Sequence, residues 1–335
     1  MSMEKIAFIS GGTFVYWSSI IMVLAALTAI TIFSAMYLFK NGSVISLTVM
    51  LPLMMVSSVM LSRLIHWYCR SDAYESLDVA LMDYSQGSYA LMGVFVACIG
   101  IAALLRLIRA VDNLPKVYDC MAIGGGAGIA VGRLASLFNA SNRGMVLPET
   151  VGLPFAYPVV NTVSGAMDNR LATFMIQAMV VGGIVVLLLL YMIISKIARK
   201  KLRDGDIGLM FLVAYGASQV ICDSTRYDSL FLRSNGFVSA VQILSLVAMV
   251  VPIVLFSVRM VKNNGLKIYH FVIWLALAGM MGLGGYMEYY VQRHGNEAAF
   301  AYTMMGIALF VIVVLTLIMR ALGLKKKRAQ VTVTA

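Results

Sequence analysis

Long, continuous apolar runs separated by short polar segments dominate this chain of 335 residues. An α-helix rises about 1.5 Å per residue, so about 20 apolar residues are needed to cross roughly 30 Å of membrane hydrocarbon. Nine runs reach this length, approximately at residues 15–38, 44–65, 88–108, 118–138, 172–195, 206–223, 237–257, 267–287 and 299–322. Because the runs show no alternation with a period of two, the pattern predicts an all-α polytopic transmembrane helical bundle of about nine spans rather than a β-barrel.

Composition supports a membrane protein and narrows its chemistry. Hydrophobic residues make up 61% of the chain and charged residues 12%, whereas soluble domains contain about half and about a quarter. A water-soluble or disordered protein is therefore excluded. The four cysteines, Cys69, Cys98, Cys120 and Cys222, form no CxxC pair and no metal-ligand spacing with the three histidines, so we expect neither a metal site nor a cofactor.

Lysine and arginine predict the orientation of the spans, because cytoplasmic loops carry the excess of these residues. With the amino terminus outside, the inner segments hold 17 of the 26 basic residues and four of the 15 acidic ones, a balance of +13. The outer segments keep nine basic and eleven acidic residues, a balance of −2. The carboxyl terminus is then cytoplasmic, and we interpret its cluster Lys325–Arg328 as an anchor beside anionic lipid rather than as a nucleic-acid site.

The polar segments are too short for a separate soluble domain. The longest, residues 66–87 and 139–171, are both outside in this topology, and the second contains Pro148, Pro154 and Pro158. The last two spans follow a basic connector at residues 259–267. We therefore predict a seven-span core over residues 1–260 and two additional spans with a basic cytoplasmic tail over residues 261–335.

Three arginines, Arg63, Arg133 and Arg226, lie in or next to the predicted spans, all in the outer leaflet. An arginine at the membrane centre costs at least ~2.5–3.5 kcal/mol. Arg133 is some five residues, or about 8 Å, inside its helix end. Each side chain could extend to the interface at a helix carboxyl end. Alternatively, the guanidinium groups could converge on the phosphate of a phospholipid headgroup.

Residues near these arginines suggest partners for them. Arg63 and His66 are three positions apart and share a helix face. Asp223 and Arg226 have the same spacing, which predicts an ion pair between them if the helix continues past Asp223.

Three glycines, Gly124, Gly128 and Gly132, follow one another at intervals of four residues in the span that ends with Arg133. This spacing is typical of close packing between membrane helices. The same bare face could also leave room for a lipid headgroup.

Several of these residues belong to motifs of a known family. The run Gly132–Gly144 resembles the signature Gly-Arg-x-Gly-Asn-Phe-x-Asn-x-Glu-x-x-Gly of the prolipoprotein diacylglyceryl transferase family. Tyr215-Gly216, Asp223–Arg226 and Gln242–Ser245 resemble its last block, and Ser62–Tyr68 resembles an earlier one. The order and spacing agree over roughly residues 45–260, and seven spans with an outer amino terminus is the family's architecture.

Some motif positions carry other residues. Ser136 and Ser141 stand where the signature has asparagine and glutamate. Gln219 and Asp223 stand where the last block has arginine and glutamate. The stretch Ser88–Gly93 replaces the family's His-Gly-Gly-x-x-Gly.

The resemblance implies transfer of a diacylglyceryl group from phosphatidylglycerol to the lipobox cysteine of a prolipoprotein, in the plasma membrane of a bacterium. Glycerol phosphate would leave, and cations would stabilise its charge. The substrate thiol must also lose a proton, to His66 or to a water held by Asp223. The expected partners are phosphatidylglycerol, the prolipoprotein signal peptide with its lipobox, and membrane lipid.

The predicted site comprises catalytic and substrate-binding residues. The predicted catalytic residues are Arg133, Arg226, Asp223 and His66, and the predicted substrate-binding residues are Arg63, Tyr89, Ser136, Asn139, Ser141, Gly144 and Gln219.

Two alternatives remain. A non-catalytic relative could bind phospholipid or lipoprotein precursors in the same pocket. A transporter of another class is disfavoured by arginines in one leaflet, because transport sites usually lie near the midplane.

Overall fold

The computed structural model describes residues 5–83, 88–148, 150–160, 165–199, 202–232, 235–294 and 297–324. Parts of two basic segments used to predict the topology, Lys200, Lys201 and Lys325–Arg328, lie outside the described residues. The orientation of the chain in the membrane stays a prediction.

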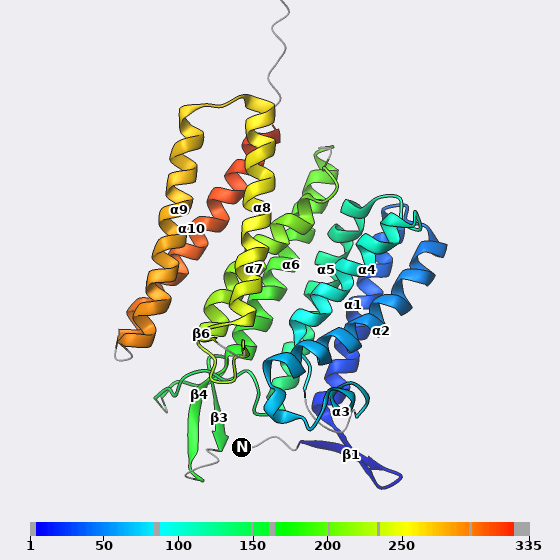
Figure 1. The fold of residues 1–335 in the computed structure, drawn as a ribbon, viewed down its shortest axis with the longest axis vertical. Helices are drawn as coiled ribbons and strands as arrows, with labels where there is room; N and C mark the ends of the chain where they lie inside the picture. Colours follow the sequence, from blue (N-terminus) through cyan, green and yellow to red (C-terminus); the bar gives the residue numbers. More distant parts are fainter. Residues whose placement is uncertain are drawn as a thin grey trace, which may run out of the picture. The chain divides into compact units, whose positions relative to one another are not determined.

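The described residues are mostly helical (Figure 1). The α-helices are α1 (Trp17–Phe39), α2 (Val44–Cys69), α3 (Leu77–Met82), α4 (Leu91–Leu107), α5 (Leu114–Arg133), α6 (Thr173–Ile197), α7 (Asp206–Ser224), α8 (Ala240–Asn264), α9 (Ile268–Arg293) and α10 (Ala298–Leu324). Short 3₁₀ helices are η1 (Ser71–Ala73) and η2 (Leu134–Leu137). Strands β1 (Ile6–Ser10), β2 (Thr13–Tyr16), β3 (Ala156–Val160), β4 (Met167–Leu171), β5 (Phe231–Leu232) and β6 (Asn235–Ser239) form three antiparallel two-stranded hairpins.

The predicted all-α membrane bundle is confirmed. Each predicted span coincides with a helix, and eight of these helices are long and apolar enough to cross a membrane. The remaining one, α4, is apolar but has only 17 residues. The chain is therefore a multi-pass membrane protein. The three hairpins and α3 were not predicted. The hairpin of β1 and β2 precedes the first span, and the other two hairpins and α3 lie between spans.

The chain divides into two compact units. The first contains residues 1–211 and 222–244, and the second contains residues 212–221 and 245–335. In the first unit, the hairpins and α3 lie at one end of the helices, which we call the hairpin end (Figure 1). The turns that join α1 to α2, α4 to α5 and α6 to α7 lie at the other end. The hairpin end is the one predicted to face outside.

The glycine face of α5 packs against α1. A Cβ atom added at Gly124 would lie 2.7 Å from the backbone nitrogen of Phe33 and 2.8 Å from the carbonyl oxygen of Ala29. One added at Gly128 would lie 2.7 Å from the Cβ atom of Ala29. The close-packing interpretation of these glycines is therefore confirmed, and the face that we considered for a lipid headgroup is covered by α1.

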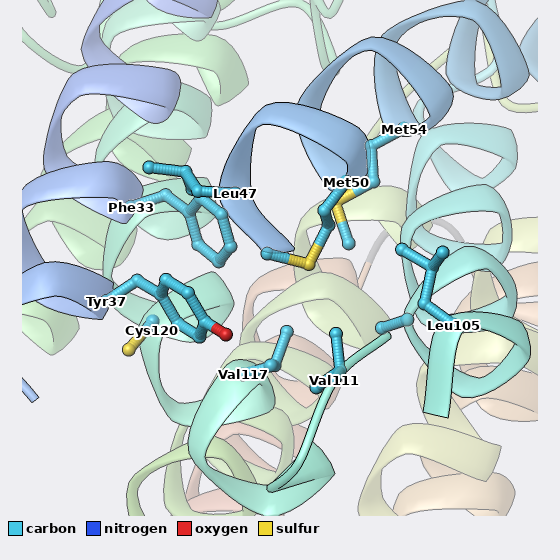
Figure 2. Packing of buried hydrophobic residues seen from close by; sticks show 10 residues of the cluster. Phe33, Tyr37, Leu47, Met50, Met54, Leu105, Val111, Val117 and Cys120 are labelled. Atoms are coloured by element: carbon cyan, nitrogen blue, oxygen red, sulfur yellow. The ribbon is translucent and has the colours of Figure 1, made fainter. Parts of the chain in front are cut away.

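An apolar cluster joins α1 and α5 to α2 and α4 (Figure 2). Its buried members are Phe33, Tyr37, Leu47, Met50, Met54, Ala102, Leu105, Val111, Val117 and Cys120. Lipid tails are as apolar as these side chains, so helix association in a membrane depends on close packing and polar contacts rather than on removal of water.

A buried carboxylate joins three segments at the end opposite the hairpins. Asp119 on α5 accepts a hydrogen bond from Lys40 Nζ at 2.9 Å. It also accepts from the backbone nitrogens of Gly205 at 3.0 Å and Gly208 at 2.9 Å. These two backbone nitrogens lie at the amino-terminal end of α7, where unpaired N–H groups and the helix dipole favour an anion. Asp119 therefore connects α1, α5 and α7.

The second unit contains the antiparallel pair α9 and α10, which pack side by side (Figure 1). Asn263 and Asn264, at the carboxyl end of α8, donate side-chain hydrogen bonds to the carbonyls of Gly323 and Leu322. These bonds satisfy carbonyl groups that the last turn of α10 leaves without helical partners.

Substitution of Gly124 tests the contact between α1 and α5. We expect Gly124→Ala to destabilise the protein by about 1–3 kcal/mol, because the methyl group would overlap backbone atoms of α1. A loss of this size lowers the Tm by about 2–4 °C per kcal/mol. The matched control is Gly125→Ala, since a Cβ atom there meets nothing within 4 Å. Thermal unfolding in detergent would contradict this packing if both variants had the same Tm.

Candidate functional site

The loop after α5, residues 134–144, holds the side chain of Arg133 in place. Arg133 ends α5 and is half-buried. Its Nη1 donates a 2.8 Å hydrogen bond to Oδ1 of Asn142. The Asn142 amide in turn donates to Oγ of Ser136 at 2.9 Å and to Oγ of Ser141 at 3.2 Å. Arg133 is therefore held by the loop that continues its own helix.

The backbone of Asn142 connects this loop to two other segments. Its φ angle is +57°, a left-handed conformation that asparagine tolerates better than most residues. Its N–H donates to Oδ2 of Asp228 at 2.9 Å, and its carbonyl accepts from the N–H of Phe174 at 3.1 Å. Asn142 thus links the loop to the start of α6 and to the segment after α7.

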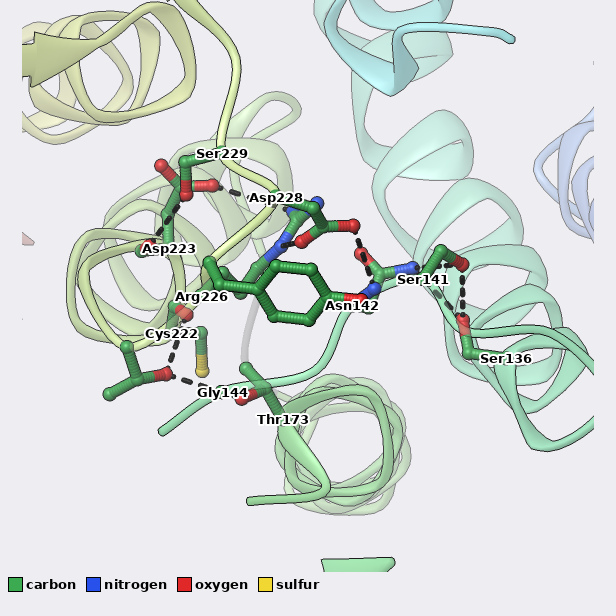
Figure 3. A network of polar contacts seen from close by, with 12 residues as sticks. Ser136, Ser141, Asn142, Gly144, Thr173, Cys222, Asp223, Arg226, Asp228 and Ser229 are labelled. Carbon is green, nitrogen blue, oxygen red and sulfur yellow. Dashed lines mark hydrogen bonds and ion pairs between the residues drawn. The ribbon is translucent and has the colours of Figure 1, made fainter. Parts of the chain in front are cut away.

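Arg226 lies just after α7 and binds two carboxylates (Figure 3). Its Nε donates to Oδ1 of Asp228 at 2.9 Å, and its Nη1 lies 3.4 Å from Oδ1 of Asp223. The predicted ion pair between Asp223 and Arg226 is therefore present. Asp223 is buried and also accepts a hydrogen bond from Oγ of Ser239, at the end of β6.

Asp228 joins the two arginine sites into one polar network. One of its oxygens accepts from Arg226 and the other from the Asn142 backbone (Figure 3). The Asn142 side chain in turn binds Arg133. Two arginines and two aspartates at the hairpin end therefore share one hydrogen-bonded network. Pairing offsets the cost of placing these charges in a medium of low dielectric constant.

Gly144 allows the loop to approach the segment after α7. It forms an isolated antiparallel β-bridge with Arg226. A Cβ atom at Gly144 would lie 2.8 Å from Oγ1 of Thr173 and 2.8 Å from the carbonyl oxygen of Thr225. A larger residue would push the loop away from Arg226.

Arg143 is a buried cation in the same loop, with a relative exposure of 1%. Its guanidinium carbon lies 4.3 Å from the ring centroids of both Tyr157 and Phe174. Burial, which disfavours the charged form, lowers the pKa of Arg143 to about 10. The side chain is still protonated at neutral pH.

Arg63 and His66 belong to a separate cluster on α2. Arg63 donates from Nε to the carbonyl of Ala80 at 2.5 Å and from Nη2 to the carbonyl of Asp83 at 2.7 Å, at the carboxyl end of α3. Nδ1 of His66 lies 2.7 Å from the hydroxyl of Tyr74.

The aromatic rings of Tyr74 and Tyr89 complete the Arg63 cluster. The guanidinium carbon of Arg63 lies 5.9 Å from the ring centroid of Tyr74 and 5.3 Å from that of Tyr89. The structure thus joins Arg133 to Arg226 and Asp223, and it groups Arg63, His66 and Tyr89 around α3.

The other predicted site residues fall into two groups. Ser136, Asn139, Ser141 and Gly144 form the loop after α5, where Oδ1 of Asn139 accepts from the Ser141 backbone at 3.0 Å. Gln219 is buried on α7 within the second unit.

No motif in the sequence indicated a role for Asn142, Arg143, Asp228 or Ser239. Asn142 and Arg143 fall on unspecified positions of the signature. Asp228 lies two residues after Arg226, and this proximity was the one feature of the sequence that could have indicated an interaction between them.

Comparison with known proteins agrees with the motifs. A family model described as prolipoprotein diacylglyceryl transferase matches residues 5–258, and no curated protein matches the chain. The chain belongs to the prolipoprotein diacylglyceryl transferase family. Membership makes it a transferase of lipoprotein biosynthesis and supports prolipoprotein diacylglyceryl transfer as its general function. Its partners are accordingly a prolipoprotein and a phospholipid, and a transporter of another class is not supported.

The role of Asp228 can be tested by hydrogen exchange. Asp228→Ala removes the charged acceptor of the half-buried Asn142 N–H, a loss of about 1.5–3 kcal/mol for a hydrogen bond to a charged group. We expect faster exchange in peptides that cover residues 136–144, measured by mass spectrometry.

Asp168→Ala is the matched control for this experiment. Asp168 forms an ion pair with Arg170, also two positions away, at 3.2 Å and with similar exposure. Equal exchange in the wild type and in Asp228→Ala would show that Asp228 does not hold the loop.

Proposed function

We propose that this protein transfers the diacylglyceryl group of phosphatidylglycerol to the lipobox cysteine of prolipoproteins, at the outer face of a bacterial plasma membrane. The observation that carries the proposal is the link between Arg133 and Arg226 through Asn142 and Asp228. Two guanidinium groups from different segments can stabilise one phosphate, because each offers a fork of N–H donors that matches phosphate oxygens.

The proposed reaction is a substitution at carbon. The cysteine sulfur first loses its proton, for which His66 or a water held by Asp223 is the predicted acceptor, and then forms a bond to the terminal carbon of the diacylglyceryl group. The bond from that carbon to the phosphate oxygen breaks, and glycerol phosphate leaves with the electron pair. Negative charge therefore accumulates on the phosphate, where Arg133 and Arg226 would stabilise it.

Asp223 and Asp228 fit a supporting role in this mechanism. They bind two sides of the Arg226 guanidinium, so they fix its direction before the lipid arrives, and such preorganisation lowers the cost of stabilising charge during reaction. Asp223 is itself held by Ser239. Catalytic or binding roles for Arg63, His66, Tyr89 and Gln219 stay predictions.

Substitution of the two arginines tests the proposal. We expect Arg133→Ala and Arg226→Ala each to lower kcat/KM by about 10²–10³-fold, the typical effect of removing one group that stabilises transition-state charge. The assay measures release of glycerol phosphate from phosphatidylglycerol and the mass gain of a lipobox peptide. Arg70→Ala is the control, because Arg70 is an exposed arginine at the same end of α2 as Arg63.

The outcomes separate the remaining alternatives. A wild-type protein that binds phosphatidylglycerol through Arg133 and Arg226 but releases no glycerol phosphate would be a non-catalytic relative. Transfer that survives the combined Arg133→Ala and Arg226→Ala substitutions would contradict the mechanism even if the reaction is right.

A further inference from the structure

Arg143 has a costly environment that the proposed reaction does not explain. The side chain is almost completely buried, and its guanidinium group packs against the rings of Tyr157 on β3 and Phe174 on α6, which meet each other edge to face. In the described part of the chain, its Nε and Nη1 atoms are buried without a hydrogen-bond partner. A buried donor without a partner is destabilising, and such groups in native proteins call for an explanation.

The remaining nitrogen of Arg143, Nη2, binds carbonyl groups of the loop. Nη2 donates to the carbonyl of Ser136 at 2.5 Å and to the carbonyl of Asn139 at 3.0 Å. The hydroxyl of Tyr157, one of the two rings against Arg143, donates to the carbonyl of Leu137 at 3.1 Å. Arg143 and Tyr157 therefore hold three carbonyls of the segment between Arg133 and Asn142.

The backbone of Arg143 is hydrogen-bonded to the segment that contains Arg226. Its carbonyl accepts a 3.2 Å hydrogen bond from the N–H of Tyr227, the residue after Arg226. The residue before it, Asn142, binds Arg133 with its side chain and Asp228 with its N–H. Arg143 thus lies where the loop meets both arginine-bearing segments.

We propose that Arg143 is a positioning residue of the transferase, which holds Asn142 so that Arg133 and Arg226 face the same phosphate. This inference rests on the proposed function. Arg143 does not touch the lipid in this proposal, because its side chain is buried, its Nη2 is bonded to two loop carbonyls, and the rings of Tyr157 and Phe174 pack against its guanidinium group.

A positioning role differs from general stabilisation in its kinetics. Displacing Asn142 misaligns Arg133 relative to the reacting phosphate, and misplacement by about 1 Å can cost about 10²-fold in rate. The loss should appear in kcat with little change in KM. It should also depend on Asn142, because the effect passes through that residue.

The test uses Arg143→Met, Asn142→Gly and the double variant in the full-length protein. Asn142→Gly keeps the positive φ angle while removing the side chain that binds Arg133. We expect Arg143→Met to lower kcat about 10²-fold with a nearly unchanged KM. The double variant should be no slower than Asn142→Gly alone. Additive losses in the double variant would overturn the proposal.

Two further variants sharpen the result. Arg143→Lys keeps a positive charge but lacks the planar fork and stacking surface, so we expect it to behave like Arg143→Met. Full activity of Arg143→Lys would show that charge alone suffices and would overturn the proposal. Arg293→Met is the matched control, because Arg293 also lies over a tyrosine ring, at 5.6 Å from the centroid of Tyr289, but belongs to α9 rather than to the loop or its contacts.

Hydrogen exchange gives a readout that does not depend on activity. We expect faster exchange in peptides covering residues 136–144 of Arg143→Met than in the wild type, and no such change in Arg293→Met. Unchanged exchange in Arg143→Met would overturn the proposal. If the wild type shows no transfer, the proposed function fails, whereas the exchange result still decides whether Arg143 holds the loop.

Discussion

The hydrogen bond between the Asn142 N–H and the Asp228 carboxylate is the contact on which the candidate site depends. Arg133 and Arg226 are distant in sequence, and this bond joins the loop that holds one to the carboxylate that holds the other. Charged groups near a membrane must be paired or hydrogen-bonded to be tolerated. The network meets that requirement and leaves two guanidinium groups in one region of the hairpin end.

Helix packing brings the segments of this network to their positions. Apolar side chains gain little by leaving lipid for protein, so the first unit depends on the glycine face of α5 against α1 and on the polar contacts of Asp119 at the opposite end. The α5–α1 contact fixes the helix that ends in Arg133, and Asp119 fixes the start of α7, the helix that leads to Arg226.

Much of the fold could be predicted from the sequence, but only part of the site. Apolar length predicted the spans, and the four-residue interval between glycines predicted the packing face of α5. The three-residue spacing predicted the Asp223–Arg226 ion pair, but Arg226 lies past the end of α7 at Ser224 rather than along a continuing helix. The depth of an arginine does not reveal its direction around the helix axis, so the grouping of Arg63 with α3 could not be predicted. The roles of Asn142, Arg143 and Asp228 could not be predicted either. These residues lie in loops that the tertiary fold brings into contact, and many of their hydrogen bonds involve backbone groups, which no residue pattern specifies.

The most direct measurement is an experimental density map of the protein in a lipid bilayer that contains phosphatidylglycerol. The account predicts a lipid phosphate within hydrogen-bonding distance of both the Arg133 and the Arg226 guanidinium groups, with Asn142 still bound to Asp228. A phosphate bound elsewhere, or guanidinium groups that point to different surfaces, would contradict it.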